Sequence, residues 1–137
     1  MSEPQSILML PWQVTLDEFS RAASAITDGG ACCVFVIDDG IPASARSGYA
    51  ALVIAYARED EPVCILEGGA AALLIRSGGV ESGRVVANRV MEQMKRLGLR
   101  ETLRAGVKAL DGEVRPALDG ARQEAVAAAP GAIAVAQ

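Results

Sequence analysis

The sequence predicts an α/β fold with a mainly parallel sheet, a β-α-β-α-β start and a helical C-terminal portion. Residues 31–37 and 63–66 are short apolar runs rich in β-branched side chains, a composition typical of strands buried on both faces. Between them, residues 47–58 carry apolar side chains at helical spacing. A strand, a helix and a second strand in this order predict a right-handed unit with parallel strands. From Ser82 onward, helical spacing dominates.

The length and charge of the chain favour one domain with two unlike portions. A chain of 137 residues fits a single domain with a buried core. Residues 1–83, the expected sheet-forming portion, carry four Lys or Arg against eleven Asp or Glu, whereas residues 84–137, the expected helical portion, carry nine against six. The simplest explanation is attraction between the two portions within the fold. The net charge of −4 argues against a dedicated nucleic-acid binder.

The N-terminal elements follow from local signals. Residues 7–14 predict a first strand, which Pro11 places at a sheet edge because proline cannot donate a ladder hydrogen bond. Thr15 and Glu18 form a capping-box pattern at the start of a helix over residues 16–27.

The segment after Leu66 has two interpretations. Gly68 and Gly69 could form a tight hairpin, with residues 70–75 as its second strand. Alternatively, these glycines precede a helix over Ala70 to Arg76. The alanine content favours the helix.

Helical spacing continues to residue 110. Val86, Val90, Met94 and Leu97 form one stripe, and residues 99–110 predict a second helix after Gly98. Residues 113–129 could form a third helix, and residues 132–136 a last strand or an ordered arm. Across the chain, the following residues are expected in the core: Val34, Val36, Leu52, Val53, Val63, Ile65, Met94 and Leu103.

All three cysteines fall in the expected strands, which indicates buried, reduced thiols and a cytoplasmic protein. Cys32 and Cys33 are adjacent, so they point to opposite faces of a strand and cannot clamp one metal ion. The sequence contains no histidine, so the usual zinc sites are absent and we expect no cofactor. No apolar run reaches the length of a membrane span or of a signal-peptide core.

Candidate site residues follow the central strand. Asp38 and Asp39 lie at its carboxyl end, where paired acids could hold Mg²⁺ or act as general acid and base. The alternative is that they cap a turn. Ser47 is a phosphorylation candidate, because a phosphoryl group there would meet the positive N-terminus of the next helix. Here the alternative is an N-capping serine.

Four positive residues recur at intervals of four: Arg96, Arg100, Arg104 and Lys108. On one helix they would repel one another, so an opposing surface is expected to offset them. That surface could be the acidic portion of the same fold, a second subunit, or nucleic acid. The nucleic-acid option rests on LGLRETLRAG, whose order of helix, glycine and second helix is similar to that of helix-turn-helix modules.

Residues 9–80 resemble a STAS domain of the anti-sigma-factor antagonist type. The resemblance rests on LPWQVTLDEFSRAASAI, VFVIDDGI, ASARSGYAALVIAYA and VCILEGGAAALLIRSGGV. In that family the turn before the helix reads Asp-Ser-Ser/Thr-Gly, and its first serine is a phosphorylated switch. Here the turn reads Ala45-Arg46-Ser47-Gly48, so only Ser47 and Gly48 match.

No motif in the sequence identifies a catalytic activity, and whether the chain is an enzyme stays open. The STAS resemblance implies a non-catalytic regulatory or adaptor domain that docks to a protein partner. One alternative is a small-ligand or Mg²⁺-dependent enzyme with an acidic site at Asp38 and Asp39. A second is nucleic-acid binding through the C-terminal helices. We also expect a homo-oligomer, most simply a dimer, because the apolar segment 131–136 would otherwise be exposed.

Overall fold

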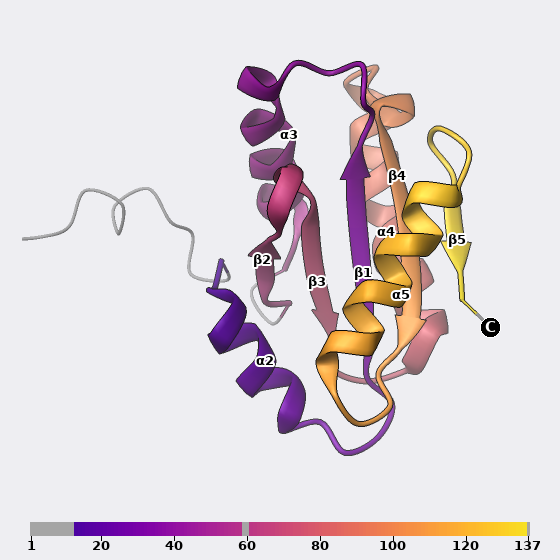
Figure 1. Cartoon of the computed structure of the whole chain (residues 1–137). Coiled ribbons are helices and arrows are strands. Elements are labelled where there is room, and N and C mark those ends of the chain that lie inside the picture. Colours follow the sequence, from indigo (N-terminus) through magenta and orange to yellow (C-terminus); the bar gives the residue numbers. More distant parts are fainter. Residues whose placement is uncertain (1–12, 59–60, 137) are drawn as a thin grey trace, which may run out of the picture.

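The computed structural model describes residues 13–58 and 61–136, which form a five-stranded sheet with helices on both faces (Figure 1). The helices are α2 (Leu16–Ser24), α3 (Ala43–Tyr56), α4 (Gly79–Arg96) and α5 (Val114–Ala127), with short 3-10 helices η1 (Glu67–Gly69) and η2 (Arg100–Thr102). The strands are β1 (Ala31–Ile37), β2 (Val63–Ile65), β3 (Ala71–Ile75), β4 (Leu103–Ala109) and β5 (Ile133–Val135). The strand expected over residues 7–14 lies outside the described residues, apart from Gln13 and Val14.

The sheet is mostly antiparallel, so the expectation of a mainly parallel sheet is wrong. Its strand order is β2-β3-β1-β4-β5, and among the strand pairs of the described residues only β4–β5 is parallel. β1 and β2 do run in the same direction, because both are antiparallel to β3. However, β3 lies between them, so the expected strand-helix-strand unit is split by a third strand.

β3 occupies the segment whose alanine content favours a helix, and that expectation is also wrong. All five residues of β3 are buried, and the strand pairs with β1 on one edge and β2 on the other. Gly68 and Gly69 adopt φ values of 78° and 85° in the preceding turn, which glycine reaches without strain. The turn sends the chain back antiparallel to β2. Hydrogen bonding on both edges of β3 then outweighs the helix preference of alanine, since helix propensities of ordinary residues differ by less than about 1 kcal/mol per residue.

Each face of the sheet has its own apolar core. α3 and α4 cover one face, where Phe35 and Met91 are fully buried. α2 and α5 cover the other, where Phe19 and Leu74 are fully buried. Figure 1 shows α5 in front of the sheet and α4 behind it. The small side chains that dominate the composition allow helices to pack closely against both faces.

The C-terminal portion is not all helical. The helix expected over residues 99–110 is replaced by η2 and the strand β4. Leu103 and Val107 are four residues apart, a spacing that fits one face of a helix and equally one face of a strand. In β4 they share a core cluster with Ala105, two residues from each. The possible third helix and last strand are present as α5 and β5.

The expected core is largely correct. Five of its residues are buried: Val34, Val53, Val63, Met94 and Leu103. Val36 and Leu52 are half-buried and pack against the margins of the two cores. The expectation that Ile65 lies in the core is wrong: this residue is 37% exposed, because β2 lies at the edge of the sheet.

The helix ends follow local chemistry. The capping box at α2 is confirmed: the Thr15 N–H donates to Glu18 Oε1 at 3.0 Å, and the Glu18 N–H donates to Thr15 Oγ1 at 3.1 Å. α3 begins after Pro42, which offers no side-chain cap. Among the described residues, no helix combines the length and apolar character that crossing a membrane requires.

Candidate functional site

The carboxyl end of β1 opens into a turn that fixes Asp38. Its backbone N–H donates to Thr102 O at 2.8 Å, and its carbonyl accepts from the Ile41 N–H at 3.0 Å. Its side-chain Oδ2 accepts from the Gly40 N–H at 3.1 Å. One carboxylate oxygen of Asp38 therefore caps the turn, as the structural alternative anticipated. The other oxygen, Oδ1, lies 3.4 Å from Arg104 Nη2, and both residues line a cavity.

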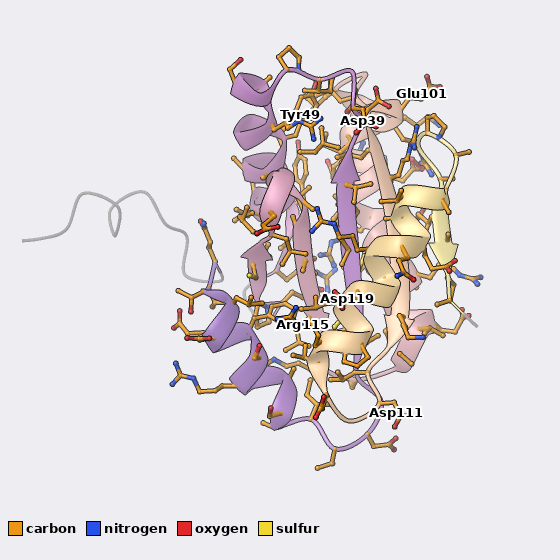
Figure 2. All side chains as sticks on the ribbon, viewed as in Figure 1. Asp39, Tyr49, Glu101, Asp111, Arg115 and Asp119 are labelled. Carbon is orange, nitrogen blue, oxygen red and sulfur yellow. The ribbon has the colours of Figure 1, made fainter. Side chains whose placement is uncertain are left out.

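This charged cavity has a volume of about 280 Å³ and is built from five elements and their loops. It lies at the end of the sheet where β1 terminates, and Figure 2 shows Asp39 at that end, opposite the end that holds Asp111. The lining residues come from the end of β1, from α3, from the turn between β2 and β3, from β4 and from α5: Val36, Ile37, Asp38, Asp39, Arg46, Gly68, Ala70, Arg104, Arg122 and Val126. Elements from both faces of the sheet thus meet here.

Two arginines hold the turn between β2 and β3 in place. Arg46 of α3 donates to Gly68 O at 3.3 Å, and also to Ile41 O at 3.2 Å and Asp38 O at 3.4 Å. Arg122 of α5 donates to Glu67 O at 2.8 Å. These bonds tie the turn to the loop after β1 on one side and to α5 on the other.

Arg104 of β4 joins Asp38 directly. Its Nη2 lies 3.4 Å from Asp38 Oδ1, and its Nη1 donates to Val126 O at 3.4 Å. Its Nε is buried and has no acceptor among the described residues. The cavity lining therefore holds three arginines against two aspartates, an excess of one positive charge. Such a site can bind an anionic group, and guanidinium forks match phosphate oxygens.

A second, more apolar cavity adjoins the charged one. It has a volume of about 480 Å³, and Arg46 and Gly68 line both cavities. Its other walls come from α3, β2, the turn and the segment before α2: Gln13, Ala50, Ala51, Ile54, Ile65 and Gly69. A ligand with a charged part and a flat apolar part could span the two cavities.

The structure brings some of the predicted site residues together and separates others. Asp38, Asp39 and Arg104 line one cavity. Arg100 instead pairs with Glu92 at 3.2 Å. The remaining two positions are dispersed as well: Arg96 ends α4, and Lys108 lies on β4.

The expected basic helical stripe is therefore wrong, since its members come from a helix end, a 3-10 turn and a strand. The helix-turn-helix interpretation of this segment is also wrong, because η2 and the strand β4 stand where its second helix was expected. The acidic portion does offset one of these charges, through Asp38 and Arg104. Ser47 lies inside α3, whose N-cap position is occupied by Pro42.

Sequence reasoning missed Arg46 and Arg122 as lining residues. Arg46 lies only eight residues after Asp38, just beyond the turn that follows the central strand, and this short separation was a usable signal. No sequence signal pointed to Arg122, because α5 reaches the cavity only through its packing across β4 and β1.

The thiols are not candidates for nucleophilic chemistry. Burial raises the pKa of Cys32 to about 12, and burial is also the main cause that raises the pKa of Cys33. The pKa of Cys64 is raised by burial as well. Because the thiolate is the reactive form, these thiols are inert at neutral pH.

No family model matches the sequence, and no curated protein matches it. Solved structures do match. The chain resembles the GGDEF domain of YfiN (also called TpbB) from Pseudomonas aeruginosa with a TM-score of 0.68 and 16% identity, over 93% of this chain and 99% of that one. The chain has the fold of a GGDEF domain.

Two further structures agree with this fold. The GGDEF domain of FimX from Pseudomonas aeruginosa matches with a TM-score of 0.64 and 16% identity, over 89% of this chain and 94% of that one. A shortened form of YfiN that comprises only its GGDEF domain matches with a TM-score of 0.59 and 17% identity, over 90% of each chain. At these identities the likeness shows the fold alone.

The GGDEF likeness corrects two expectations. The STAS resemblance of residues 9–80 is wrong, because the matching structures are GGDEF domains and the sheet is mostly antiparallel. The non-catalytic docking function inferred from that resemblance loses its basis. The alternative, a small-ligand or enzymatic site at the end of the central strand, fits the fold and the charged cavity better.

Proposed function

We propose that this chain is a diguanylate cyclase-like domain whose charged cavity binds the phosphates of a guanine nucleotide. The likeness to GGDEF domains supports the class of function. The charged cavity supports the ligand class, because Arg46, Arg104 and Arg122 line it from three separate elements. The adjoining apolar cavity, which shares Arg46 and Gly68, offers a place for a flat base.

The observation that carries this proposal is the convergence of three arginines at the end of β1. Each Arg–phosphate hydrogen bond is charge-assisted and contributes about 1.5–3 kcal/mol. Removal of one guanidinium should therefore weaken nucleotide binding by about tenfold or more.

Calorimetric titration with GTP tests the proposal. The wild-type chain should bind GTP, and Arg122→Gln should bind it about tenfold more weakly. Arg84→Gln is the matched control, since Arg84 is exposed on α4 and does not line the charged cavity. Absence of GTP binding by the wild-type chain, or an equal loss in Arg84→Gln, would contradict the proposal.

A second candidate is a degenerate version of the domain that binds nucleotide without cyclase turnover. The five-residue string Gly-Gly-Asp-Glu-Phe, which the name GGDEF spells, does not occur in this sequence. The Gly-Gly pair at the cavity, Gly68-Gly69, is followed by Ala70 and Ala71 where that string has Asp and Glu. The two candidates separate on incubation with GTP and Mg²⁺: a product that contains two guanylates supports the cyclase, and binding without product supports the degenerate version.

We also propose a single domain, a homodimer and a cytoplasmic location. One sheet shared by both portions supports the single domain. A product with two guanylates would need two cavities, which supports a dimer. Exposure of the apolar C-terminal segment no longer argues strongly for a dimer, because β5 pairs with β4 and the segment Ile133–Val135 is half-buried. Three buried thiols support a reducing compartment. Light scattering with and without GTP would test the dimer.

A further inference from the structure

The ion pair between Asp38 and Arg104 bears on whether the charged cavity accepts Mg²⁺. Mg²⁺ requires near-octahedral oxygen ligands and is usually held by one or two carboxylates together with substrate phosphates. Asp38 Oδ1 faces Arg104 Nη2 at 3.4 Å, and Asp38 Oδ2 accepts the Gly40 N–H at 3.1 Å. Both oxygens thus already have donors, and one of those donors carries a full positive charge.

Few other carboxylates are available nearby. Asp39 is the other acid in the lining, and it is exposed. Ala70, which also lines the cavity, offers no side-chain oxygen. Within residues 13–58 and 61–136, no group of three or more His, Cys, Asp or Glu side chains could hold a metal ion. A Mg²⁺ ion held by Asp38 would have to displace the Arg104 guanidinium from Oδ1 or the Gly40 N–H from Oδ2, and for this reason the residues present do not fit a Mg²⁺ site.

Arg104 already supplies positive charge at this position. Its guanidinium lies between Asp38 Oδ1 and Val126 O, and its buried Nε has no acceptor in the described part of the chain. Arg46 and Arg122 line the same cavity. A ligand with consecutive phosphoryl groups would therefore meet guanidinium groups where a metal-dependent site would present a divalent metal ion.

We propose that the charged cavity binds a polyphosphate group without a divalent cation, with Arg104 in the place of the metal ion. Its extension to nucleotides rests on the proposed function. Guanidinium is always charged at physiological pH and forms two-point hydrogen bonds with phosphate oxygens. Binding should then depend on Arg104 and be nearly indifferent to Mg²⁺.

The role of Asp38 separates this arrangement from a metal site. If Asp38 held a metal ion, Asp38→Asn would abolish nucleotide binding. In the proposed arrangement, Asp38 competes with phosphate for Arg104 and adds a negative charge to the cavity. Asp38→Asn should therefore strengthen metal-free binding by about threefold or more, since the substitution removes a negative charge that repels the phosphate groups.

The experiment is a calorimetric titration with tripolyphosphate and, separately, with GTP, each in EDTA and in excess MgCl₂. In EDTA, the wild-type chain should bind tripolyphosphate, Arg104→Gln at least tenfold more weakly, and Asp38→Asn more tightly. Arg104→Lys keeps the charge but loses the fork, so its affinity should fall between wild type and Arg104→Gln. Arg84→Gln is again the control and should match wild type, because Arg84 lies outside the cavity lining.

The outcomes separate the two proposals. GTP binding that appears only with Mg²⁺, or that Asp38→Asn abolishes, overturns metal-independent binding and leaves the nucleotide function standing. Metal-free binding of tripolyphosphate without any GTP binding supports the role of Arg104 and overturns the nucleotide function. Binding of neither ligand overturns both. If Arg104→Gln fails to fold, the opposite signs expected for Asp38→Asn still decide the matter.

Discussion

Arg89 of α4 and Glu61, which precedes β2, form a two-point ion pair. Both terminal nitrogens of Arg89 reach the Glu61 carboxylate, and Arg89 Nη2 also donates to Tyr56 O at 3.3 Å. Glu61 Oε1 accepts from the Arg58 N–H at 2.8 Å. The side chains are 22% and 11% exposed, respectively. The pair therefore fastens the end of α3 and the start of β2 to α4.

Removal of one partner of this pair should destabilise the fold. Arg89→Leu leaves the Glu61 carboxylate largely buried without its cation, so the free energy of unfolding should fall by about 2–3 kcal/mol. Urea unfolding followed by circular dichroism measures this. The matched control is Arg84→Leu. Arg84 Nη2 lies 3.8 Å from Glu81 Oε1, and the two side chains are 55% and 74% exposed, so the free energy of unfolding should change by no more than about 0.5 kcal/mol. Equal effects of the two substitutions would contradict the structural role of Arg89.

Gly106 should tolerate no side chain. A Cβ added there would lie 2.0 Å from Ala121 O and 2.5 Å from Ala125 N, because α5 packs its backbone directly on β4. Gly106→Ala should lower the free energy of unfolding by about 3 kcal/mol. Gly48→Ala is the control, since a Cβ at that position in α3 would meet nothing within 4 Å. It should raise stability by about 0.5–1 kcal/mol through helix propensity. A neutral Gly106→Ala would show that α5 lies farther from the sheet.

The capping box should make stability depend on pH in the acid range. The hydrogen bond from the Thr15 N–H is the main cause that holds the pKa of Glu18 below its ordinary value of 4.5. A lowered folded-state pKa adds stability above the unfolded pKa, and this part is lost as pH falls through the lowered value. Glu18→Gln should remove this part of the pH dependence. Carboxyl chemical shifts would measure the titration, and a midpoint at or above 4.5 would rule the effect out.

The strand cysteines should react only after unfolding. Burial raises the pKa of Cys32 to about 12, and both Cys32 and Cys33 are 0% exposed. At pH 8, a disulfide reagent should label them at least about a hundredfold faster in urea than in the native state. Raising the pH toward 12 should speed native labelling only as the fold itself opens. Rapid native labelling at pH 8 would place these thiols outside the core.

The sequence predicts well the features that depend on neighbours along the chain. Thr15 and Glu18 are three residues apart, and their capping box is present as expected. The apolar run 31–37 matches the bounds of β1, because β-branched side chains bounded by Asp38-Asp39-Gly40 leave little choice of start and end. Cys32 and Cys33 lie in opposite core clusters, as the alternation of a strand requires.

The sequence predicts only some of the residues that line the charged cavity. Asp38 could be singled out because it directly follows the central strand. Its partner Arg104 is 66 residues away along the chain, and it reaches Asp38 only because β4 pairs antiparallel with β1. On the helix expected from its spacing, Arg104 would point elsewhere. Strand pairing therefore decides the charge balance of the cavity.

Local patterns along the sequence determined most element positions, the two-sided burial of β1 and the acid at its end. Tertiary structure alone decided the strand order, the identity of β3 and β4 as strands, and the meeting of three arginines at one cavity. The physical reason is that a four-residue apolar spacing fits a helix and a strand equally, and that alanine's weak preference for helix yields to pairing on both edges. Hydrogen bonds from neighbouring strands settle the choice for both segments: β1 pairs with β3 and with β4, while β2 and β5 pair with their other edges.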